Sequence, residues 1–496
     1  MNPQNLDQNV MPVGGNAGTE AGAPAGVDGS GSNHQIPRAD APGPEGADGT
    51  SVLPAAQSGV EHSTSIGDRV AEAYVRLGDP SAELTTEDRE VLTQATVRGL
   101  HDHVNPALAK WRKSGDARAC EWRGQGWLLY DLAGNEYIDC LGGYGVFNFG
   151  HLHPRIVDAV QRGLTRMGIH SQELLNPWQA RFATKFAELA PGDLQYVFFS
   201  NSGTESVEAA IKFAMMRTGR HEIIGTVNGY HGKTLGSLSA TFREVFRAPF
   251  EPLLSFRSVP YNDASELEAA IGPQTAAFIM EPVQGEAGII VPDRDYLPRV
   301  RELCTKHGVL LILDEVQTCM GRTGKHFACE HWGVVPDLMC VAKSIGGGII
   351  PMGVTIGTAR VWEALEPNPF IHSNTFGGNP LACVAGLAAM EVLVEERLAE
   401  QSATTGQHFA DGLMALKSEF PQLIREVRGL GLMIGIEFMD RDNGVKAAKE
   451  LFNAKVLVAH TLNNPKVMRI EPPLMIPVEA VDEVLQRFRS VLEKMG

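Results

Sequence analysis

Two residues of complementary chemistry, an acid and a lysine, each follow a short apolar run in the second half of the chain. Asp314 follows the run Val309–Leu313, and Lys343 follows Leu338–Ala342. Both runs have the length and composition of a strand that is buried on both faces, as in a parallel sheet. The interval between them is long enough for a crossover connection. Because parallel strands end at the same edge of a sheet, we expect the two side chains to lie close together.

A lysine beside a carboxylate suits one chemistry in particular. A lysine amine can form a Schiff base with an aldehyde cofactor, while a carboxylate keeps the nitrogen of a pyridine ring protonated, so that the ring acts as an electron sink. The glycines at 346–348, close behind the lysine, would let a bulky ligand approach the backbone. Taken singly, Asp314 could be a helix cap and Lys343 a solvated surface lysine, since short motifs often match by accident.

A third group of residues suits a phosphate. Tyr196–Ser200 has the pattern of a strand, and Ser202, Gly203 and Thr204 follow it at the start of an expected helix. The free N–H groups and the dipole of a helix N-terminus, together with two hydroxyls, attract a phosphate. An isolated S-G-T sequence would be explained equally well as an ordinary helix cap. Its position after a strand, in company with the acid and the lysine, favours phosphate binding.

Two nucleotide-binding motifs are absent. A Walker loop that ends at Gly232-Lys233-Thr234 would need a glycine where Val227 stands. A dinucleotide fingerprint that starts at Gly143 would need a glycine where Asn148 stands.

Two other expected strands end in groups that could contact a ligand. Ile223–Val227 leads to Tyr230 and His231, and an aromatic ring at a strand exit can lie flat on a planar cofactor. A further apolar run, Ala276–Met280, ends in a loop that carries Glu281 and Glu286. Their carboxylates could attract an amine or organise other polar groups. On spacing alone, the tyrosine could be a core or rim residue and the glutamates could be solvated loop charges.

The joint sequence of these segments resembles a known family. LILDEVQTCMGRTGK followed by PDLMCVAKSIGGG is similar to the subgroup III aminotransferases of fold type I, the ornithine and ω-amine enzymes, which use pyridoxal phosphate. The resemblance runs from about Asp116 to the C-terminus. Within the family, the chain is most similar to the putrescine-type members, through SQELLNP, SNSGTESVEAAIK, EVQTCMGRTGKHFACEH, TFGGNPLAC and TLNNPKVMRIEPPL.

The resemblance implies an α/β fold, with a large domain on a mostly parallel central sheet and a smaller α+β domain. We expect residues 149–395 to form the large cofactor-binding domain and residues 396–496 to form the C-terminal small domain. Residues 63–148 begin with a helical pattern and continue with a β segment that turns at Gly134-Asn135. They would form an N-terminal segment and part of the small domain.

The family's cofactor contacts fall on individual residues of this chain. The resemblance implies that Lys343 holds pyridoxal phosphate and then moves a proton between the donor carbon and the cofactor. Asp314 would keep the ring nitrogen protonated, and Gln317 would contact the ring hydroxyl. Tyr230 would stack on the ring, with His231 next to it in the site.

Other implied roles concern the phosphate and the substrates. Ser202–Thr204 would bind the phosphate, and Thr375 would reach the phosphate of the neighbouring subunit, which implies a homodimer, or a dimer of dimers, with shared active sites. Arg469 would bind the carboxylate of the keto acid. Glu286 would mask that arginine during the amine half-reaction, and Glu281 would supply a further carboxylate near the amine.

The implied reaction moves the terminal amino group of a diamine, putrescine or cadaverine, to 2-oxoglutarate, and gives an aminoaldehyde and glutamate. Ornithine, acetylornithine or 4-aminobutyrate as donor, or the amination of a larger aldehyde, are alternatives, and pyruvate is the second candidate acceptor. Ornithine-type members carry arginine where this chain has Lys233, which favours the diamine. A cofactor-binding regulator without catalysis is the alternative from another class, but such regulators usually carry a DNA-binding module.

Composition limits the class of protein. The chain has 496 residues, of which 43% are hydrophobic and 21% charged, so it is globular and long enough for two lobes. A net charge of −16 argues against nucleic-acid binding. No apolar run approaches the roughly 18 residues that a membrane span requires, and no signal peptide is visible. We therefore expect a cytoplasmic protein that acts on small molecules.

The cysteines and the N-terminal segment have no pattern that indicates chemistry. The seven cysteines form no CxxC pair and are expected to be reduced and mostly buried, and no spacing indicates a metal site. Residues 1–62 contain 11 Gly and 7 Pro but no Phe, Trp, Tyr or Lys. Such a segment cannot bury enough apolar surface to offset the entropy of ordering, so we expect a disordered tail.

Overall fold

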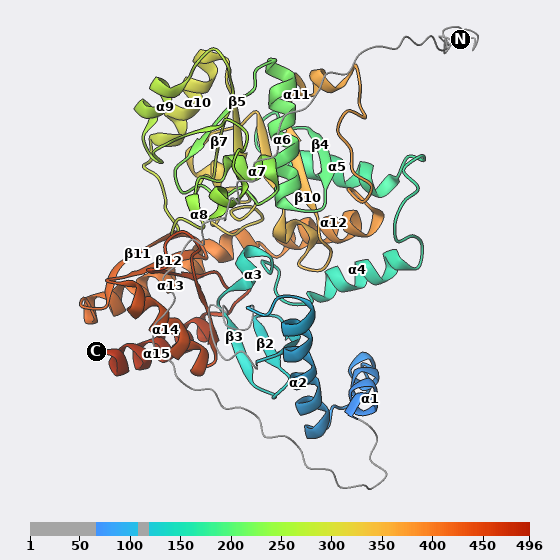
Figure 1. Ribbon diagram of the computed structural model, residues 1–496, viewed down its shortest axis with the longest axis vertical. Helices are drawn as coiled ribbons and strands as arrows, with labels where there is room; N and C mark the ends of the chain where they lie inside the picture. The colour runs from blue at the N-terminus through green and yellow to red at the C-terminus, as the bar shows by residue number, and fades with distance from the viewer. Residues whose placement is uncertain (1–65, 108–118) are drawn as a thin grey trace, which may run out of the picture. The chain divides into compact units, whose positions relative to one another are not determined.

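The computed structural model describes residues 66–107 and 119–496. In this part of the chain, the strands form one seven-stranded sheet and two four-stranded sheets, with helices packed around them (Figure 1). The expected α/β fold with a mostly parallel central sheet is confirmed. The expected tail, residues 1–62, lies outside the described residues.

The seven-stranded sheet has the order β4-β10-β9-β8-β7-β5-β6. Its strand β10 is antiparallel to both of its neighbours, and every other neighbouring pair in the sheet is parallel. The strands are β4 (Tyr196–Ser200), β5 (Glu222–Thr226), β6 (Arg257–Val259), β7 (Thr275–Met280), β8 (Leu310–Asp314), β9 (Leu338–Val341) and β10 (Gly353–Gly357). The parallel strands therefore end at one edge, where the predicted site residues follow them.

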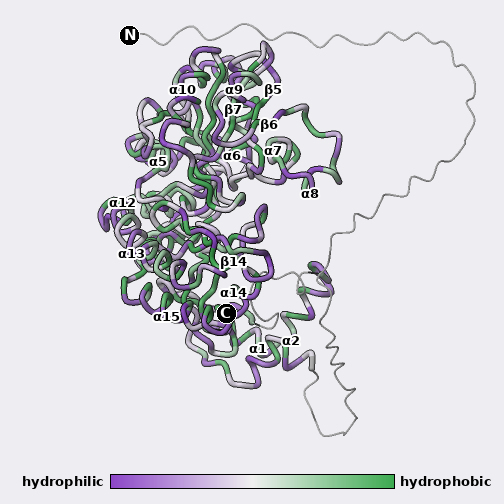
Figure 2. Tube along the Cα trace, turned by 90° about the vertical axis from the view of Figure 1, so that its left-hand side faces the viewer, coloured by the Kyte–Doolittle hydropathy of each residue, from purple (hydrophilic) through white to green (hydrophobic). Residues whose placement is uncertain are grey.

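Helices cover both faces of this sheet, which explains why its central strands are apolar at every position. Strands β7, β8 and β9 are buried throughout. Leu310 and Ile312 of β8 pack in one hydrophobic cluster with Val207 of α6 (Gly203–Thr218). Leu311 packs in the other cluster with Leu297 of α10 (Tyr296–His307). Alternate residues thus face opposite layers, and the trace along β7 is correspondingly hydrophobic in Figure 2.

Two of the remaining helices begin at start signals in the sequence. Helix α2 begins after a capping box made by Thr85 and Asp88, and α5 begins at Pro177 after Asn176, whose side chain accepts hydrogen bonds from two backbone N–H groups. The other helices are α1 (Ile66–Gly78), α2 (Thr86–His103), α3 (Gly142–Gly145), α4 (Pro154–Leu164), α5 (Pro177–Leu189), α7 (Leu235–Ala240), α8 (Glu244–Arg247), α9 (Ala264–Ala270), α11 (Ala359–Trp362), α12 (Pro380–Glu395), α13 (Leu398–Glu419), α14 (Arg441–Asn453) and α15 (Val478–Met495).

One of the two smaller sheets combines strands from the two ends of the described chain, and the other contains C-terminal strands alone. One has the order β1-β2-β3-β13 and the other β11-β12-β15-β14. Their strands are β1 (Glu121–Gln125), β2 (Leu128–Asp131), β3 (Glu136–Asp139), β11 (Ile424–Leu430), β12 (Met433–Phe438), β13 (Val456–Leu457), β14 (Ala459–His460) and β15 (Val467–Ile470). The predicted turn between β2 and β3 is confirmed, with Gly134 at φ 84°.

One apolar run is divided between two sheets. Val456–Ala459 has the sequence pattern of a single strand, but β13 pairs in parallel with β3 and β14 pairs antiparallel with β15. The two halves bond to different sheets, so the strand is interrupted at Val458. The expected division into residues 149–395 and 396–496 stays a prediction.

Two expectations from composition can be compared with the structure directly. All seven cysteines are buried and unpaired, as predicted. Among the described residues, no helix is both long and apolar enough to cross a membrane.

A buried arginine links distant parts of the fold. Arg322, in the segment after β8, is fully buried. Its Nη1 donates hydrogen bonds to the carbonyl oxygens of Leu432 at 2.8 Å and Pro472 at 2.6 Å, and its Nη2 donates to Oδ1 of Asn148 at 2.6 Å. These bonds join the end of the central sheet to the C-terminal segment and to the chain just after α3.

We predict that Arg322→Ala lowers the free energy of unfolding by about 3 kcal/mol or more, because two buried carbonyls and an amide oxygen would lose charged donors. Urea denaturation measures the effect. Arg162→Ala serves as a control, since that arginine is exposed and pairs only with Asp158 on the same helix, and it should cost less than about 0.5 kcal/mol. Equal costs for the two variants would contradict the structural role of Arg322.

Candidate active site

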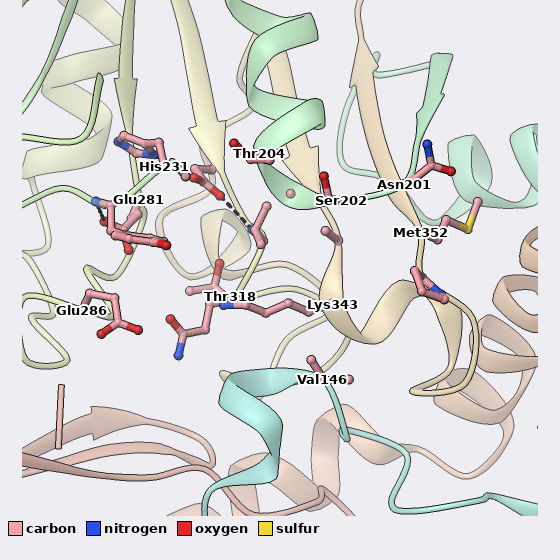
Figure 3. A pocket seen from close by; sticks show the side chains of 18 of the residues that line it. Val146, Asn201, Ser202, Thr204, His231, Glu281, Glu286, Thr318, Lys343 and Met352 are labelled. Carbon is pink, nitrogen blue, oxygen red and sulfur yellow. Dashed lines mark hydrogen bonds and ion pairs between the residues drawn. The ribbon is translucent and has the colours of Figure 1, made fainter. Parts of the chain in front are cut away.

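A cavity of about 600 Å³ opens at the edge of the central sheet where the parallel strands end. That volume is typical of small-molecule sites. Figure 3 shows its wall, with Ser202 and Thr204 at one side, Glu281 and Glu286 at another, and the Lys343 side chain extending between them. Most of the predicted site residues line it: Ser202, Gly203, Thr204, Tyr230, His231, Glu281, Glu286, Asp314, Gln317 and Lys343.

The acid and the lysine are brought together by strand pairing. Strands β8 and β9 are parallel neighbours, and Asp314 lies opposite Cys340 in their register. Lys343 follows two residues after β9 ends and has a φ of 53°, in the left-handed region that side chains other than glycine rarely adopt. The backbone strain turns the lysine out of the strand direction and into the cavity, as strained residues at functional sites often do.

The Lys343 amine is easier to deprotonate than an ordinary lysine. Desolvation by burial lowers its pKa, while the negative charge of Glu471, and then that of Glu286, opposes the shift. A neutral amine is a nucleophile, whereas an ammonium is not. The environment therefore suits a lysine that attacks a carbonyl carbon.

Asp314 is held by a buried histidine. Its Oδ2 lies 2.7 Å from Nδ1 of His231, and its Oδ1 accepts a hydrogen bond from the backbone N–H of Val316 at 3.0 Å. Burial alone would lower the pKa of His231, but the hydrogen bond to Asp314 and the charge of that carboxylate outweigh burial, and the pKa is raised. His231 therefore donates to the carboxylate and fixes its orientation at the cavity wall.

The start of α6 forms another wall of the cavity. The Ser202 hydroxyl accepts a hydrogen bond from the backbone N–H of Glu205 at 3.3 Å, so the serine caps the helix and also lines the cavity. The Thr204 hydroxyl lies 2.6 Å from that of Ser237. A Cβ at Gly232 would come within 2.2 Å of the Thr204 Oγ1, so only glycine fits there. Hydroxyls and helix N–H groups thus gather at this side, which suits an anion.

Glu281 is a buried carboxylate with backbone partners. Its Oε1 accepts a hydrogen bond from the N–H of Tyr230, and its Oε2 accepts one from the N–H of Gly285, each at 3.0 Å. Burial raises its pKa to about 7; the charge of Asp314 adds to the rise, and the charge of His231 opposes it. This carboxyl group therefore fixes the position of the tyrosine at the cavity wall.

Glu286 covers the arginine that was predicted to bind substrate. Its Oε2 lies 2.6 Å from Nη2 of Arg469 and accepts a hydrogen bond from the N–H of Leu462 at 2.7 Å. Arg469 is fully buried, and its guanidinium carbon lies 5.0 Å from the centre of the Tyr144 ring. Glu286 lines the cavity and Arg469 does not, so the glutamate stands between the arginine and the cavity.

The short helix α3 positions the tyrosine beside this arginine. Asp139 accepts hydrogen bonds from the N–H groups of Leu141 at 3.0 Å and Gly142 at 2.8 Å, and its other oxygen lies 2.8 Å from Nε2 of His151. Tyr144 adopts a φ of 61° within this turn. His151 thus has a structural role, because it holds the carboxylate that caps this turn.

Sequence analysis missed one buried acid, Glu471. It is fully buried, its Oε1 accepts a hydrogen bond from Nε2 of Gln317 at 2.6 Å, and its Oε2 lies 3.7 Å from Nη1 of Arg469. A signal was present, because an acidic residue within the apolar run MRIEPPL, two positions after an arginine at a strand end, points to the same side as that arginine.

Thr375 lies outside the cavity, whereas Lys233 lines it. Thr375 is exposed and does not line the cavity of its own chain; its carbonyl accepts a hydrogen bond from Gln172 at 2.8 Å. Lys233 lines the cavity, with its Nζ 4.5 Å from the centre of the Phe246 ring. Among the described residues, no cluster of three or more His, Cys, Asp or Glu side chains could hold a metal ion.

Comparison with known proteins identifies the family. The model of the class III aminotransferases matches residues 112–492. The chain belongs to the class III aminotransferases. It is 50% identical over 431 residues to a putrescine aminotransferase from Pectobacterium atrosepticum, a match that covers 84% of this chain and 92% of that protein. The resemblance predicted from the motifs is thereby confirmed, and the protein is a pyridoxal-phosphate-dependent transaminase.

Solved structures of similar proteins support the same family. An ornithine aminotransferase from Toxoplasma gondii, with pyridoxal phosphate at partial occupancy in its active site, has a TM-score of 0.75 and 30% identity and covers 87% of this chain and 98% of its own. An amine transaminase from an uncultivated Pseudomonas species, with pyridoxal phosphate bound, has a TM-score of 0.71 and 29% identity and covers 76% of this chain and 95% of its own.

The residues present fit this cofactor. An amine of lowered pKa, a carboxylate held by a histidine and an anion-binding helix start all line one cavity of sufficient size. These are groups of the kind that the aldehyde, the ring nitrogen and the phosphate of pyridoxal phosphate would need.

We predict that the free energy of unfolding of cofactor-free Glu281→Gln shifts in the variant's favour, relative to wild type, as pH rises from 4.5 to 7. Because the pKa is raised, the native state holds a proton that the unfolded state releases in this range, so wild-type stability falls with rising pH. Glutamine cannot ionise, and the difference in free energy of unfolding between variant and wild type should change by about 3 kcal/mol across the range, on top of a constant cost for the backbone N–H that loses its acceptor. Denaturation curves across this pH range measure it. A difference that does not vary with pH would contradict the burial of an ionisable group at this position.

Proposed function

We propose that the enzyme transfers the terminal amino group of a diamine, putrescine or cadaverine, to 2-oxoglutarate, and gives an aminoaldehyde and glutamate. The observation that carries the proposal is the Arg469–Glu286 ion pair at the cavity wall, since it hides the cation that a carboxylate-bearing donor would need. The 50% identity to a putrescine aminotransferase supports the same donor class.

Lys343 is proposed to carry the cofactor and to move the proton. Bound pyridoxal phosphate supplies an electron sink for the donor carbon that loses its proton. Lys343 would hold this group through its Nζ, and the same Nζ would accept the proton that the donor carbon loses and donate it again later in the reaction. The lowered pKa of this lysine favours the neutral base that the first transfer needs.

Four neighbouring side chains are proposed to position the cofactor ring. The Asp314 carboxylate holds a proton on the ring nitrogen, and His231 keeps that carboxylate oriented through the 2.7 Å contact at Nδ1. Gln317 contacts the ring hydroxyl, and Tyr230 packs against the ring. Preorganised charge of this kind needs no rearrangement when charge develops in the ring, which is why it accelerates the reaction.

The phosphate is proposed to bind at Ser202–Thr204, at the start of α6. Thr375, which lies outside the cavity of its own chain, is proposed to reach the phosphate in the neighbouring subunit. This arrangement would require a homodimer, or a dimer of dimers, with shared active sites. A cytoplasmic location also stays a prediction.

The two half-reactions differ in what they require of Glu286. With the diamine, Glu286 remains on Arg469, and the carboxylates of Glu281 and Glu286 leave the cavity wall acidic toward the distal ammonium. With 2-oxoglutarate, the glutamate moves away and the arginine binds a carboxylate of the keto acid. Water release and uptake balance the cycle, since each half-reaction exchanges one amino group for one carbonyl oxygen.

We predict that Arg469→Ala raises the KM for 2-oxoglutarate at least tenfold, because a buried charged hydrogen-bond donor to the carboxylate is lost. The single-turnover half-reaction with putrescine should change by less than about threefold, since that donor needs no cation there. Steady-state kinetics and stopped-flow absorbance measure the two halves. Arg155→Ala, an exposed arginine remote from the cavity, is the matched control.

The same measurements compare donors. Putrescine should exceed ornithine, acetylornithine and 4-aminobutyrate in kcat/KM, and 2-oxoglutarate should exceed pyruvate as acceptor. If ornithine outran putrescine, or if both half-reactions of Arg469→Ala fell together, the amino-acid donors would replace the diamine.

A further inference from the structure

Glu471 gives the substrate arginine a second negative neighbour. Arg469 lies between two carboxylates: Glu286 approaches its Nη2 to 2.6 Å, and Glu471 approaches its Nη1 to 3.7 Å. Glu286 contributes to the cavity wall, whereas Glu471 is fully buried behind it. Glu286 can leave the arginine by moving within the cavity, but Glu471 is enclosed and would stay.

The buried acid is fixed from both ends. Its backbone N–H donates to the carbonyl of Cys140 at 2.8 Å, and its Oε1 accepts the 2.6 Å hydrogen bond from Gln317. Its Oε2 has no hydrogen-bond partner among the described residues and points its charge toward the arginine. An unsolvated carboxylate oxygen exerts a strong field, because little water screens it.

The charge of Glu471 reaches three cations. It lies beside Arg469, and it is also the largest influence opposing the effect of burial on the pKa of the buried Arg322 and on the pKa of Lys343. An anion that reaches Arg469 therefore meets a guanidinium that two carboxylates already partly neutralise.

We propose that Glu471 is a specificity-determining residue, which acts through Arg469 to weaken carboxylate binding and to favour cationic amine donors. It remains beside the arginine in both half-reactions, so a carboxylate that displaces Glu286 still faces one opposing charge. The weaker hold on the acid also helps glutamate to leave before the next diamine binds. The preference for an amine donor in this inference rests on the proposed function. The weakening of carboxylate binding by Glu471 does not rest on it.

The test uses the cofactor-loaded enzyme and glutarate, a dicarboxylate with no reactive carbonyl. Glu471→Gln removes the charge but keeps an oxygen that can accept the hydrogen bond from Gln317. Titration calorimetry should give a glutarate Kd about tenfold lower than that of wild type, since an opposing charge near the arginine is gone. The kcat/KM for putrescine should fall about tenfold in the same variant.

Two further variants separate charge from packing. Glu471→Asp keeps the charge but withdraws it from the arginine and from Gln317, so glutarate should bind tighter than to wild type by no more than about threefold. Glu395→Gln is the control, because it removes an exposed carboxylate that does not line the cavity, and it should change the glutarate Kd by less than about threefold.

The proposal predicts that Glu471→Gln binds glutarate more tightly and uses putrescine less well, and these opposite directions decide the test. A merely structural role would weaken glutarate and putrescine together, and that result, or an unchanged glutarate Kd in Glu471→Gln, would overturn the proposal. Equal glutarate affinities in the Gln and Asp variants would also overturn it, because the hydrogen bond to Gln317 would then be the cause. If Glu471→Gln does not fold, weaker glutarate binding by Glu471→Asp overturns the proposal and tighter binding supports it. A wild-type preference for ornithine would defeat the proposed donor while leaving the glutarate result intact.

Discussion

The parallel pairing of β8 with β9 is the constraint on which the site depends. It sets Asp314 opposite Cys340, three residues before Lys343, so that the acid and the lysine emerge at the same edge. Both strands are buried on both faces by alternating contacts with two helical layers. A slip of one residue would turn each side chain to the opposite face. Core packing of the sheet therefore fixes the separation between the two groups that a pyridine cofactor needs.

A second constraint is that the charged side chains at the cavity need partners within the protein. Asp314 is oriented by His231, Glu281 by two backbone N–H groups, and Arg469 by carboxylates on two sides. None of these side chains relies on solvent alone for its partner. The Lys343 amine, by contrast, is placed where burial lowers its pKa. Reactivity is thus concentrated on one group while its neighbours are fixed.

Much of this arrangement could be predicted from the sequence, because local patterns determine where strands end and helices begin. Asp314, Lys343 and the start of α6 at Ser202 followed directly from apolar runs and their terminating residues. The bond between His231 and Asp314 could not be predicted, since it joins segments that are far apart in the chain and depends on how β5 and β8 are spaced by β7. Glu471 was missed for the same reason.

The extent of one strand could not be predicted from a local pattern either. The run Val456–Ala459 is uniformly apolar, but its partners belong to two sheets, so tertiary pairing divides it. The role proposed for Thr375 would depend on a neighbouring subunit, which a single chain does not contain. Apolar periodicity specifies which segments are buried, whereas the partners of each buried polar group are set by the completed fold.

The most direct test of the account is to find which amine carries the cofactor. Borohydride reduction fixes pyridoxal phosphate to that amine, and mass spectrometry of the digested protein locates it. Lys233 also lines the cavity, so the protein offers a second candidate. The account predicts the modification on the peptide that contains Lys343, at one cofactor per chain. Modification of Lys233 or another lysine, with Lys343 unmodified, would contradict it.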